Sequence, residues 1–263
     1  MRHSSWRLIH SGPCEAAYNM ALDEALAGSA RSGGPVTLRL YAWQGPSVTL
    51  GAFQRATDVE MEFCASSNIP VIRRPTGGRA ILHTSDELTY SFSAPTTEGL
   101  FSGDLFKSYG LLGSAFSMAF RASGLDIEGQ KDRRTARDRS PLCFKSASYA
   151  ETSVSGMKII GSAQRRWSDG MLQQGSIPYT IDRALSGLVF KGDIQSDLET
   201  AMCGIMEAGC RLSGEEFTEA LVAAFEECFG VSFEPSSPTP EEEARARGLI
   251  DSKYRSDRWT LRK

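Results

Sequence analysis

The spacing of hydrophobic residues along the chain alternates between a helical period and a period of two. Over residues 14–34 the apolar positions recur at helical spacing and the stretch ends in glycines, which predicts a helix. Residues 36–43 alternate apolar and polar side chains, and residues 47–53 follow after a Gly-Pro turn, so both segments are predicted to be strands. By the same criteria we predict a short helix over 58–67, a long amphipathic helix over 104–124, and strands over 71–74, 81–83, 88–94 and 171–182.

The middle and the end of the chain depart from this pattern. Residues 126–141 are polar and lack periodicity, which is typical of a mobile loop. A hairpin is predicted to turn at Ser155-Gly156, and beyond about residue 183 the chain is mostly helical, with a Pro/Ser-rich break before a terminal helix. Because strands dominate the first two-thirds and helices the end, we predict an α+β fold. We expect one domain, residues 1–263, with a helical C-terminal extension from about residue 183.

Composition and charge exclude several classes of function. The net charge is −3, which gives no global electrostatic case for nucleic acid. No stretch approaches the length of a membrane span, and the first residues contain no apolar segment of signal-peptide length. The 6 cysteines form no CxxC pair, and 2 of the 3 histidines lie in the first residues, which we expect to be frayed. We therefore expect a cytoplasmic protein with reduced thiols, no metal site, and no contact with nucleic acid or membrane.

The stretch RRPTGGRAILHTSDELTYSF (residues 73–92) is the first candidate for chemistry. Gly77 and Gly78 allow the backbone to approach a ligand closely and to present amide hydrogens to it. Arg73 and Arg74, just before the glycines, can hold a carboxylate or a phosphate. The stretch contains neither GxxxxGK[ST] nor GxGxxG, so it lacks the standard nucleotide fingerprints. A tight strand–strand turn flanked by solvated arginines is the alternative.

Three further residues carry candidate chemistry. His83 follows Ile81 and Leu82 on a predicted strand; it is either a hydrogen-bonded structural residue or a proton-transfer group. Cys143 follows the polar loop and is either a nucleophile or a small buried hydrophobe. Lys158 lies in the otherwise apolar run SGMKIIGSA, where a cation can lower the pKa of a thiol or stabilise an oxyanion. Sequence spacing alone does not show that Cys143 and Lys158 meet in space.

The stretch from residue 73 to 92, together with SGMKIIGSAQRRW and MLQQGSI, closely resembles the lipoate-ligase/octanoyltransferase family, also called the biotin/lipoate protein ligase family. The resemblance begins at NMALDEAL in the first predicted helix, includes WQGPSVTLGAFQ, and extends to about residue 182. It implies an α+β fold with a mixed, largely antiparallel sheet, related to biotin ligases and class II synthetases. Members of the family attach octanoyl or lipoyl groups to a lysine of a lipoyl domain.

Within this family, the sequence is more similar to transferases than to ATP-dependent ligases. The ligases usually carry a third glycine where this chain has Arg79, and many have a C-terminal accessory domain. The segment CFKSASYAE, which begins at Cys143, resembles that of cysteine-dependent octanoyltransferases, in which the cysteine becomes acylated. The resemblance therefore implies an octanoyl-[acyl-carrier-protein]:protein N-octanoyltransferase, an acyltransferase of lipoate biosynthesis that uses no cofactor.

The resemblance also implies roles for individual residues. Cys143 matches the nucleophile and Lys158 matches the essential lysine of the family. Residues implied to line the acyl or pantetheine pocket are Arg73, Gly77, Gly78 and His83, with Gly161, Ser162 and Ala163 nearby. The implied chemistry is transfer of the octanoyl group to Cys143, followed by attack of a lysine amine on that thioester.

The implied partners are octanoyl-acyl carrier protein as donor and a lipoyl domain as acceptor, on the glycine cleavage carrier protein or on an oxo-acid dehydrogenase. The basic run over 131–139 suits docking of the acidic carrier protein, and a solvated loop is the alternative. Three other functions remain open: an ATP-dependent lipoate ligase, which would need ATP and magnesium, an amidotransferase that moves octanoyl between lipoyl domains, and a non-catalytic acyl-binding or scaffold protein.

Overall fold

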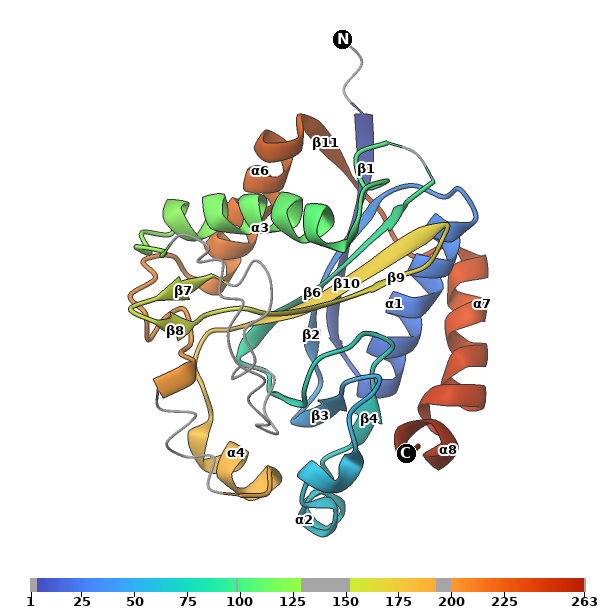
Figure 1. Ribbon diagram of the computed structural model, residues 1–263, viewed down its shortest axis with the longest axis vertical. Coiled ribbons are helices and arrows are strands. Elements are labelled where there is room, and N and C mark those ends of the chain that lie inside the picture. Colours follow the sequence, from blue (N-terminus) through green and yellow to red (C-terminus); the bar gives the residue numbers. More distant parts are fainter. Residues whose placement is uncertain (1–3, 98, 129–151, 193–199, 263) are drawn as a thin grey trace.

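A six-stranded mixed sheet forms the centre of the computed structural model, which describes residues 4–97, 99–128, 152–192 and 200–262 (Figure 1). The strands lie in the order β11-β1-β2-β6-β10-β9. Their bounds are Ser4–Cys14 for β1, Thr37–Trp43 for β2, Glu87–Pro95 for β6, Gly161–Arg166 for β9, Gly170–Pro178 for β10 and Val231–Pro235 for β11. β1 runs parallel to β11 and β2, and the remaining pairs are antiparallel. The predicted mixed, largely antiparallel sheet is confirmed.

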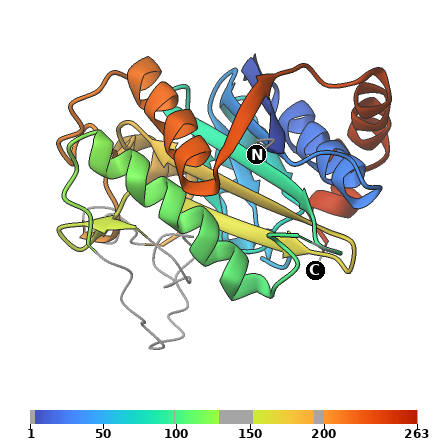
Figure 2. The same cartoon turned by 90° about the horizontal axis from the view of Figure 1, so that it is seen from above.

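Helices cover both faces of this sheet, as the view from above shows (Figure 2). One face carries α3 (Leu105–Ala122) and α6 (Gly214–Phe229), and the other carries α1 (Ala16–Arg31) and α7 (Pro240–Leu249). Side-chain alternation in β2 explains the two layers. Leu38 and Leu40 belong to the core under α3 and α6, whereas Arg39 points to α1 and hydrogen-bonds Asp23 there.

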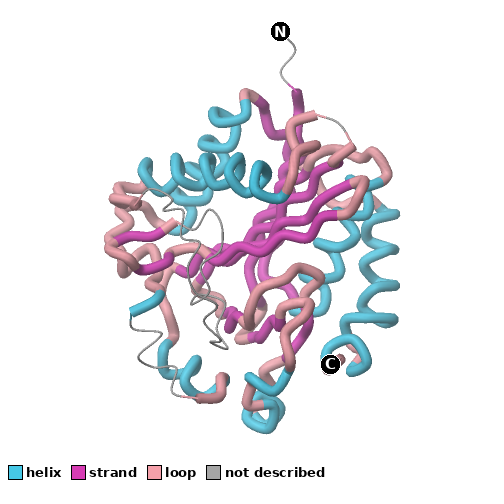
Figure 3. The backbone as a smooth tube through the Cα atoms, viewed as in Figure 1, coloured by secondary structure: helices cyan, strands magenta, loops and turns pink. Residues whose placement is uncertain are grey.

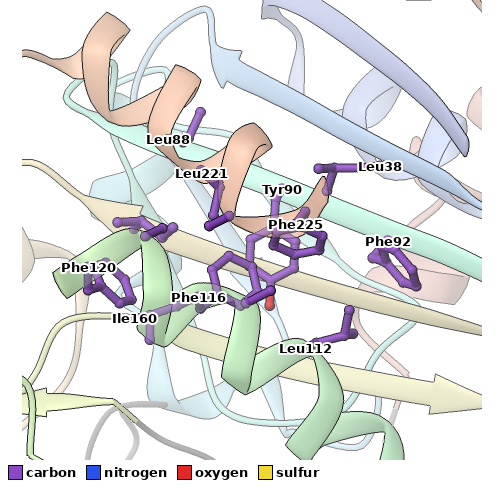
Figure 4. Packing of buried hydrophobic residues seen from close by; sticks show 14 of the residues in the cluster. Leu38, Leu88, Tyr90, Phe92, Leu112, Phe116, Phe120, Ile160, Leu221 and Phe225 are labelled. Atoms are coloured by element: carbon purple, nitrogen blue, oxygen red, sulfur yellow. The ribbon is translucent and has the colours of Figure 1, made fainter. Parts of the chain in front are cut away.

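Aromatic side chains fill the core between the sheet and the helices α3 and α6 (Figure 4). The rings of Tyr90 and Phe116 have their centroids 4.5 Å apart, and Phe116 meets Phe225 edge-on at 5.2 Å. Such contacts add to the free energy gained by removing the rings from water. They join α6, from the last part of the chain, to α3 and to the centre of the sheet.

A smaller sheet, in the order β4-β3-β5, lies below the main one in Figure 3. Its strands are Ser47–Leu50 (β3), Val71–Arg73 (β4) and Ile81–His83 (β5), and it packs against α2 (Met61–Ser66) and α4 (Arg183–Val189). The other described elements are a 3-10 turn (Ala56–Asp58), β7 (Ser153–Val154), β8 (Met157–Lys158), a π-helical turn (Ile250–Tyr254) and α8 (Asp257–Thr260).

Most predicted helices and strands are confirmed, with ends shifted by a few residues. The predicted hairpin turn is also confirmed: Ser155 and Gly156 have φ values of 51° and 79°, the left-handed pair of a two-residue turn between β7 and β8. Of the polar loop predicted over 126–141, the part from residue 129 onward lies outside the described residues. No helix within the described ranges is long and apolar enough to cross a membrane.

The expectation of a frayed start was wrong from Ser4 onward, because residues 4–14 form β1. β11 was not predicted either. The two strands pair in parallel with Ser4 opposite Val231, so β11 gains its backbone hydrogen bonds from a distant part of the chain. The same is true of the first residues of β1, because its pairing with β2 begins only at Arg7. β11 is also only 5 residues long and is flanked by helices, which hides its pattern.

Candidate active site

A pocket lies where the small sheet meets the main sheet and α1, and it encloses about 320 Å³ of space that is partly open to solvent. Its walls combine apolar and polar side chains. The apolar ones are Met20, Tyr41, Trp43, Ile81 and Ala163, and the polar ones are Thr49, Arg74, His83, Thr89, Ser162, Gln174 and Ser176; Gly161 and Gly175 complete the lining.

A second space of about 470 Å³ adjoins the first, because Ile81 and Ser176 line both. Its other walls come from β5, β6, β10 and α4, and include Glu87 and Met202. The two spaces therefore share a stretch of wall formed by β5 and β10.

The Gly-Gly turn packs directly against the end of β3. A Cβ atom added to Gly51 would lie 1.9 Å from the carbonyl oxygen of Gly78, so only glycine fits at position 51. Arg74 holds the turn from beneath: its Nη2 donates to the carbonyl oxygens of Gly77 and Arg79 at 2.6 and 2.7 Å. Gly78 itself has φ of 85°, a conformation that glycine adopts without strain. The glycines therefore allow a close approach between two segments of backbone.

Arg73 is fully buried and is not among the residues that line the pocket. Its guanidinium donates only to backbone carbonyl oxygens in the described contacts: Gly51 and Gln54 at 2.6 Å each, and Thr260 at 2.8 Å, with longer bonds to Trp259 and Arg262. Burial lowers its pKa, and the nearby Arg262 and Arg74 lower it further. Arg73 joins the C-terminal α8 to the small sheet, whereas Arg74 reaches the pocket.

His83 sits in the pocket wall within a buried polar cluster. Its Nδ1 lies 2.8 Å from Glu87 Oε1 and its Nε2 lies 2.9 Å from Thr49 Oγ1. The indole of Trp43 stacks on the imidazole with centroids 4.0 Å apart and planes 17° apart. The Trp43 Nε1–H donates to Thr89 Oγ1 at 2.7 Å and to Glu87 Oε1 at 3.0 Å. Both ring nitrogens of His83 are thus held in place, and its edge still borders the pocket.

A buried carboxylate, Asp23 on α1, anchors the opposite wall. It pairs with the equally buried Arg39 at 2.7 Å and accepts hydrogen bonds from Tyr41, Ser91 and Gln174. Burial, and then the Asp23 charge, raise the pKa of Tyr41 well above its ordinary value, so this phenol stays neutral. Because every partner is itself buried, the cluster fixes α1 against β2, β6 and β10.

Gln174 links this cluster to the Gly-Gly turn. Its amide nitrogen donates to Asp23 Oδ2 at 2.7 Å, and its amide oxygen accepts from Thr76 Oγ1 at 2.9 Å. Thr76 immediately precedes the two glycines. The turn is therefore connected to the centre of the main sheet through two buried side-chain hydrogen bonds.

The segment Gly161, Ser162 and Ala163 lies on β9 and lines the pocket, together with its β10 partner Gly175. The Ser162 hydroxyl is 2.8 Å from the Tyr90 hydroxyl, whose pKa burial raises to about 12. A Cβ on Gly175 would lie 2.3 Å from the Tyr90 ring. Because residue 175 is a glycine, the Tyr90 ring can pack against the backbone of β10, and its hydroxyl can form the hydrogen bond with Ser162.

Lys158 ends β8, 3 residues before Gly161, and its side chain is 4% exposed. Its backbone pairs with Ser153 in the hairpin and bridges Met202, a residue that lines the second space. A lysine is rarely buried to this degree unless its charge is used or paired. Lys158 is therefore a buried cation whose backbone adjoins one wall of the second space.

Cys143 lies outside the described residues, so its position relative to Lys158 is not part of the structure.

Four of the predicted site residues come together in one pocket: His83, Gly161, Ser162 and Ala163. Gly77 and Gly78 lie in the turn that Arg74 supports. Within the described ranges, no group of His, Cys, Asp and Glu residues has the arrangement of a metal site.

Comparison with known families supplies the decisive observation. The family described as the lipoyl protein ligase A/B catalytic domain matches residues 15–226. The chain belongs to this family. The matched range contains every wall of the pocket described above.

Full-length relatives give a finer comparison. The chain is 36% identical over 279 residues to an octanoyltransferase LipM from Exiguobacterium sp., a match that covers 100% of both chains. It is 36% identical over 274 residues to an octanoyltransferase LipM from Kyrpidia tusciae, covering 98% of this chain and 99% of the other.

Solved structures agree on the fold. A putative lipoate protein ligase from T. acidophilum with bound lipoic acid superposes with a TM-score of 0.82 at 23% identity, covering 98% of this chain and 99% of that one. A lipoate-protein ligase A bound with ATP gives a TM-score of 0.83 at 23% identity over the same shares of the two chains. The predicted lipoate ligase fold is confirmed.

Sequence reasoning missed several residues that build the pocket of this family member, among them Asp23, Trp43, Thr49 and Gln174. The first three lie in NMALDEAL and WQGPSVTLGAFQ, two of the stretches that carry the family resemblance, and Gln174 lies in MLQQGSI. The resemblance therefore contained a signal for these positions. The individual residues could not be identified from these stretches, because the sequence does not show which side chains face the pocket.

Proposed function

We propose that this protein is an octanoyltransferase of lipoate biosynthesis, which places an octanoyl group on a lysine of a lipoyl domain. The observation that carries this conclusion is the match over the whole chain to relatives named octanoyltransferase LipM, at 36% identity for two of them. The protein is accordingly an enzyme of the acyltransferase class. The donor that we propose is octanoyl-acyl carrier protein.

The pocket supports an aliphatic acyl substrate. Met20, Tyr41 and Ile81 provide apolar walls, and each methylene removed from water contributes about 0.8 kcal/mol to binding. Ser162 and Arg74 place polar groups at the same cavity. An acyl chain therefore has an apolar surface to occupy, within walls that also carry polar groups.

A thioester donor is already activated, so the transfer needs no ATP. We propose that the thiolate of Cys143 attacks the carbonyl carbon of the donor: a new C–S bond forms, and the old one breaks with its electron pair on the pantetheine sulfur. The lysine nitrogen of the acceptor then attacks the acyl-enzyme, a C–N bond forms, and the cysteine sulfur leaves. The product is an amide, which is more stable than either thioester.

Three of the cysteines in the described ranges contrast with this role. Burial raises the pKa of the thiols of Cys64, Cys203 and Cys228, so less thiolate is present at neutral pH. A reactive cysteine instead needs a nearby cation and access to solvent. We propose that Lys158 supplies the charge, to the thiolate and then to the oxygen of the tetrahedral intermediate.

Three reaction mixtures test the proposed function. The first contains the protein, a lipoyl domain and octanoyl-acyl carrier protein without nucleotide, and we expect the lipoyl domain to gain the mass of one octanoyl group. The second contains the protein and the lipoyl domain with free octanoate, ATP and magnesium, and we expect the mass of the lipoyl domain to stay unchanged. Transfer in the second mixture alone would establish an ATP-dependent ligase. The third mixture contains an octanoylated lipoyl domain as the donor, and transfer from it would indicate an amidotransferase.

A further inference from the structure

Phe53 is 93% exposed, and within the described ranges no other large apolar side chain is more than 54% exposed. It belongs to the turn of residues 51–54, which follows β3 and which we call the Phe53 turn. The backbone of this turn is fixed: Gln54 N–H donates to the carbonyl oxygen of Gly51 at 3.1 Å, and Ala52 N–H donates to that of Thr76 at 2.8 Å. The turn therefore presents the exposed ring at a constant place on the surface.

Two arginines hold the backbone of the Phe53 turn. Arg73 Nη1 donates at 2.6 Å to each of two carbonyl oxygens at the ends of the turn. Arg262 Nη2 donates to the carbonyl oxygen of Ala52 at 2.6 Å, and its guanidinium lies over the Trp259 ring, 3.7 Å from the centroid. A ring on such a preformed turn loses little conformational freedom when a partner covers it, and this favours binding.

Positive charge lies next to the Phe53 turn, although the chain as a whole has a net charge of −3. Arg55 directly follows the turn and is exposed, and Arg79 is 33% exposed. Arg262 is partly exposed, and burial and the nearby Arg165 lower its pKa. Asp58 offsets part of the charge through a contact of 3.8 Å with Arg79. We call Arg55, Arg79 and Arg262 the cationic rim; it suits a partner that presents carboxylates.

The Phe53 turn lies beside the wall of the pocket. A Cβ atom at Gly51 would lie 1.9 Å from the carbonyl oxygen of Gly78, so the Phe53 turn touches the Gly-Gly turn that precedes Arg79. Thr49, which lines the pocket, precedes Phe53 by four residues, so their Cα atoms are at most about 14 Å apart. A protein that covers Phe53 therefore also comes close to the pocket.

We propose that the Phe53 turn and the cationic rim are the docking surface for the lipoyl domain; this inference rests on the proposed function, in which that domain is the acceptor. The Phe53 ring packs against an apolar side chain of the domain, and the arginines of the rim pair with carboxylates around it. Aromatic and arginine side chains are enriched among the residues that dominate binding at protein interfaces. Complementary charge steers and orients the encounter.

The length of the reacting group favours the lipoyl domain over the acyl carrier protein as the occupant. A lysine side chain is short, so the folded domain that bears it has to dock close to the pocket. The octanoyl group of the donor lies at the end of a long pantetheine arm, so its carrier protein can dock farther away. A surface within about 14 Å of a residue that lines the pocket therefore fits the acceptor.

Steady-state kinetics with varied lipoyl domain and saturating octanoyl-acyl carrier protein tests this surface. For Phe53→Ala we expect the KM for the lipoyl domain to rise about 10-fold or more, with kcat close to wild type, and Phe53→Tyr should restore most of the loss. The KM for octanoyl-acyl carrier protein should not change when hydroxylamine replaces the lipoyl domain as acceptor and a protein-free blank is subtracted. Arg55→Glu should also raise the KM for the lipoyl domain, by a factor that falls with added salt.

Leu105→Ala and Arg121→Glu are the matched controls, because both residues are exposed on α3, which covers the other face of the main sheet from α1, and both variants should match wild type. An unchanged KM for the lipoyl domain in Phe53→Ala would overturn the inference, as would a rise only in the KM for octanoyl-acyl carrier protein. Absence of any transfer by the wild-type protein would instead refute the proposed function. Titration of the lipoyl domain into wild type and Phe53→Ala then tests the surface by binding alone, and equal affinities would overturn it.

Discussion

The carbonyl oxygen of Gly78 lies 1.9 Å from the point where a Cβ atom of Gly51 would sit. This close approach is the structural reason for the paired glycines, because it brings the turn and the end of β3 into one wall beside the pocket. Arg74 contacts both segments: it donates to the carbonyl oxygen of Thr49 on β3 and to that of Gly77 in the turn. The turn is thus a fixed part of the site.

We therefore expect Gly51→Ala to displace the turn. The added methyl group meets backbone, which cannot move aside as a flexible side chain does, so we expect a loss of about 1–3 kcal/mol in the free energy of unfolding. Acyl transfer should fall as well, since the pocket wall moves with the turn. Gly45→Ala is the matched control, because nothing lies within 4 Å of its Cβ position. Denaturant unfolding and the transfer assay measure both effects, and equal behaviour of the two variants would refute this role for Gly51.

The buried pair of Asp23 and Arg39 predicts a large effect on stability. Asp23→Asn leaves the guanidinium of Arg39 buried without its counter-charge, and breaking such a pair typically costs about 3–5 kcal/mol. Asp169→Asn is the contrasting variant, because the pair of Asp169 with Arg31 is about one-third exposed and solvent screens it, so its loss should cost much less. Chemical denaturation of the two variants should rank them in this order. A similar loss in both would show that burial of the Asp23 pair is unimportant.

The link between β1 and α7 predicts an acid-dependent loss of stability. Burial alone would raise the pKa of Glu242, but hydrogen bonds from Arg7 and from the backbone amide of Thr239 outweigh it and lower the pKa. A group with a lowered folded-state pKa stabilises the protein above its unfolded pKa, about 4.3 for glutamate, and loses this contribution as the pH falls through the folded pKa. Wild type should therefore be more stable than Glu242→Gln at neutral pH, and the difference should shrink below about pH 4. A difference independent of pH would contradict this assignment.

Lys158→Ala should slow acyl transfer steeply while the protein remains folded. An electrostatic contact to a developing oxyanion is typically worth about 3 kcal/mol, or roughly a hundredfold in rate. Lys158→Arg should also fail, because a guanidinium is bulkier and places its charge differently. Lys191→Ala removes an exposed lysine and serves as the control. If Lys158→Ala transfers octanoyl at the rate of the control, the buried lysine has no part in the reaction.

The periodic parts of the fold could be predicted from sequence, and the parts that depend on distant pairing could not. α1, α3 and β6 carry their pattern locally, so their existence and type were evident. β11 and the first residues of β1 pair with each other across more than 200 residues of chain, which no local pattern records.

The candidate site shows the same division. Adjacent arginines have different roles, because successive residues of an extended segment point in opposite directions: Arg73 binds backbone carbonyls and Arg74 reaches the pocket. His83 was identified as a candidate, but its partners Thr49 and Glu87 meet it only through the pairing of β3 with β5 and the return of the chain along β6. The sequence motifs therefore indicated which part of the chain forms the site, whereas the contacts between its side chains became known only from the fold.

The central claim is that the octanoyl group passes through a thioester on Cys143, and the mass of the intact protein tests it most directly. After mixing with octanoyl-acyl carrier protein alone, the wild-type protein should gain the mass of one octanoyl group, and hydroxylamine should remove it. Cys143→Ala should gain nothing, while Cys64→Ala and Cys203→Ala, which alter buried thiols, should behave like wild type. Full transfer to a lipoyl domain by Cys143→Ala, with no adduct at any stage, would contradict the account.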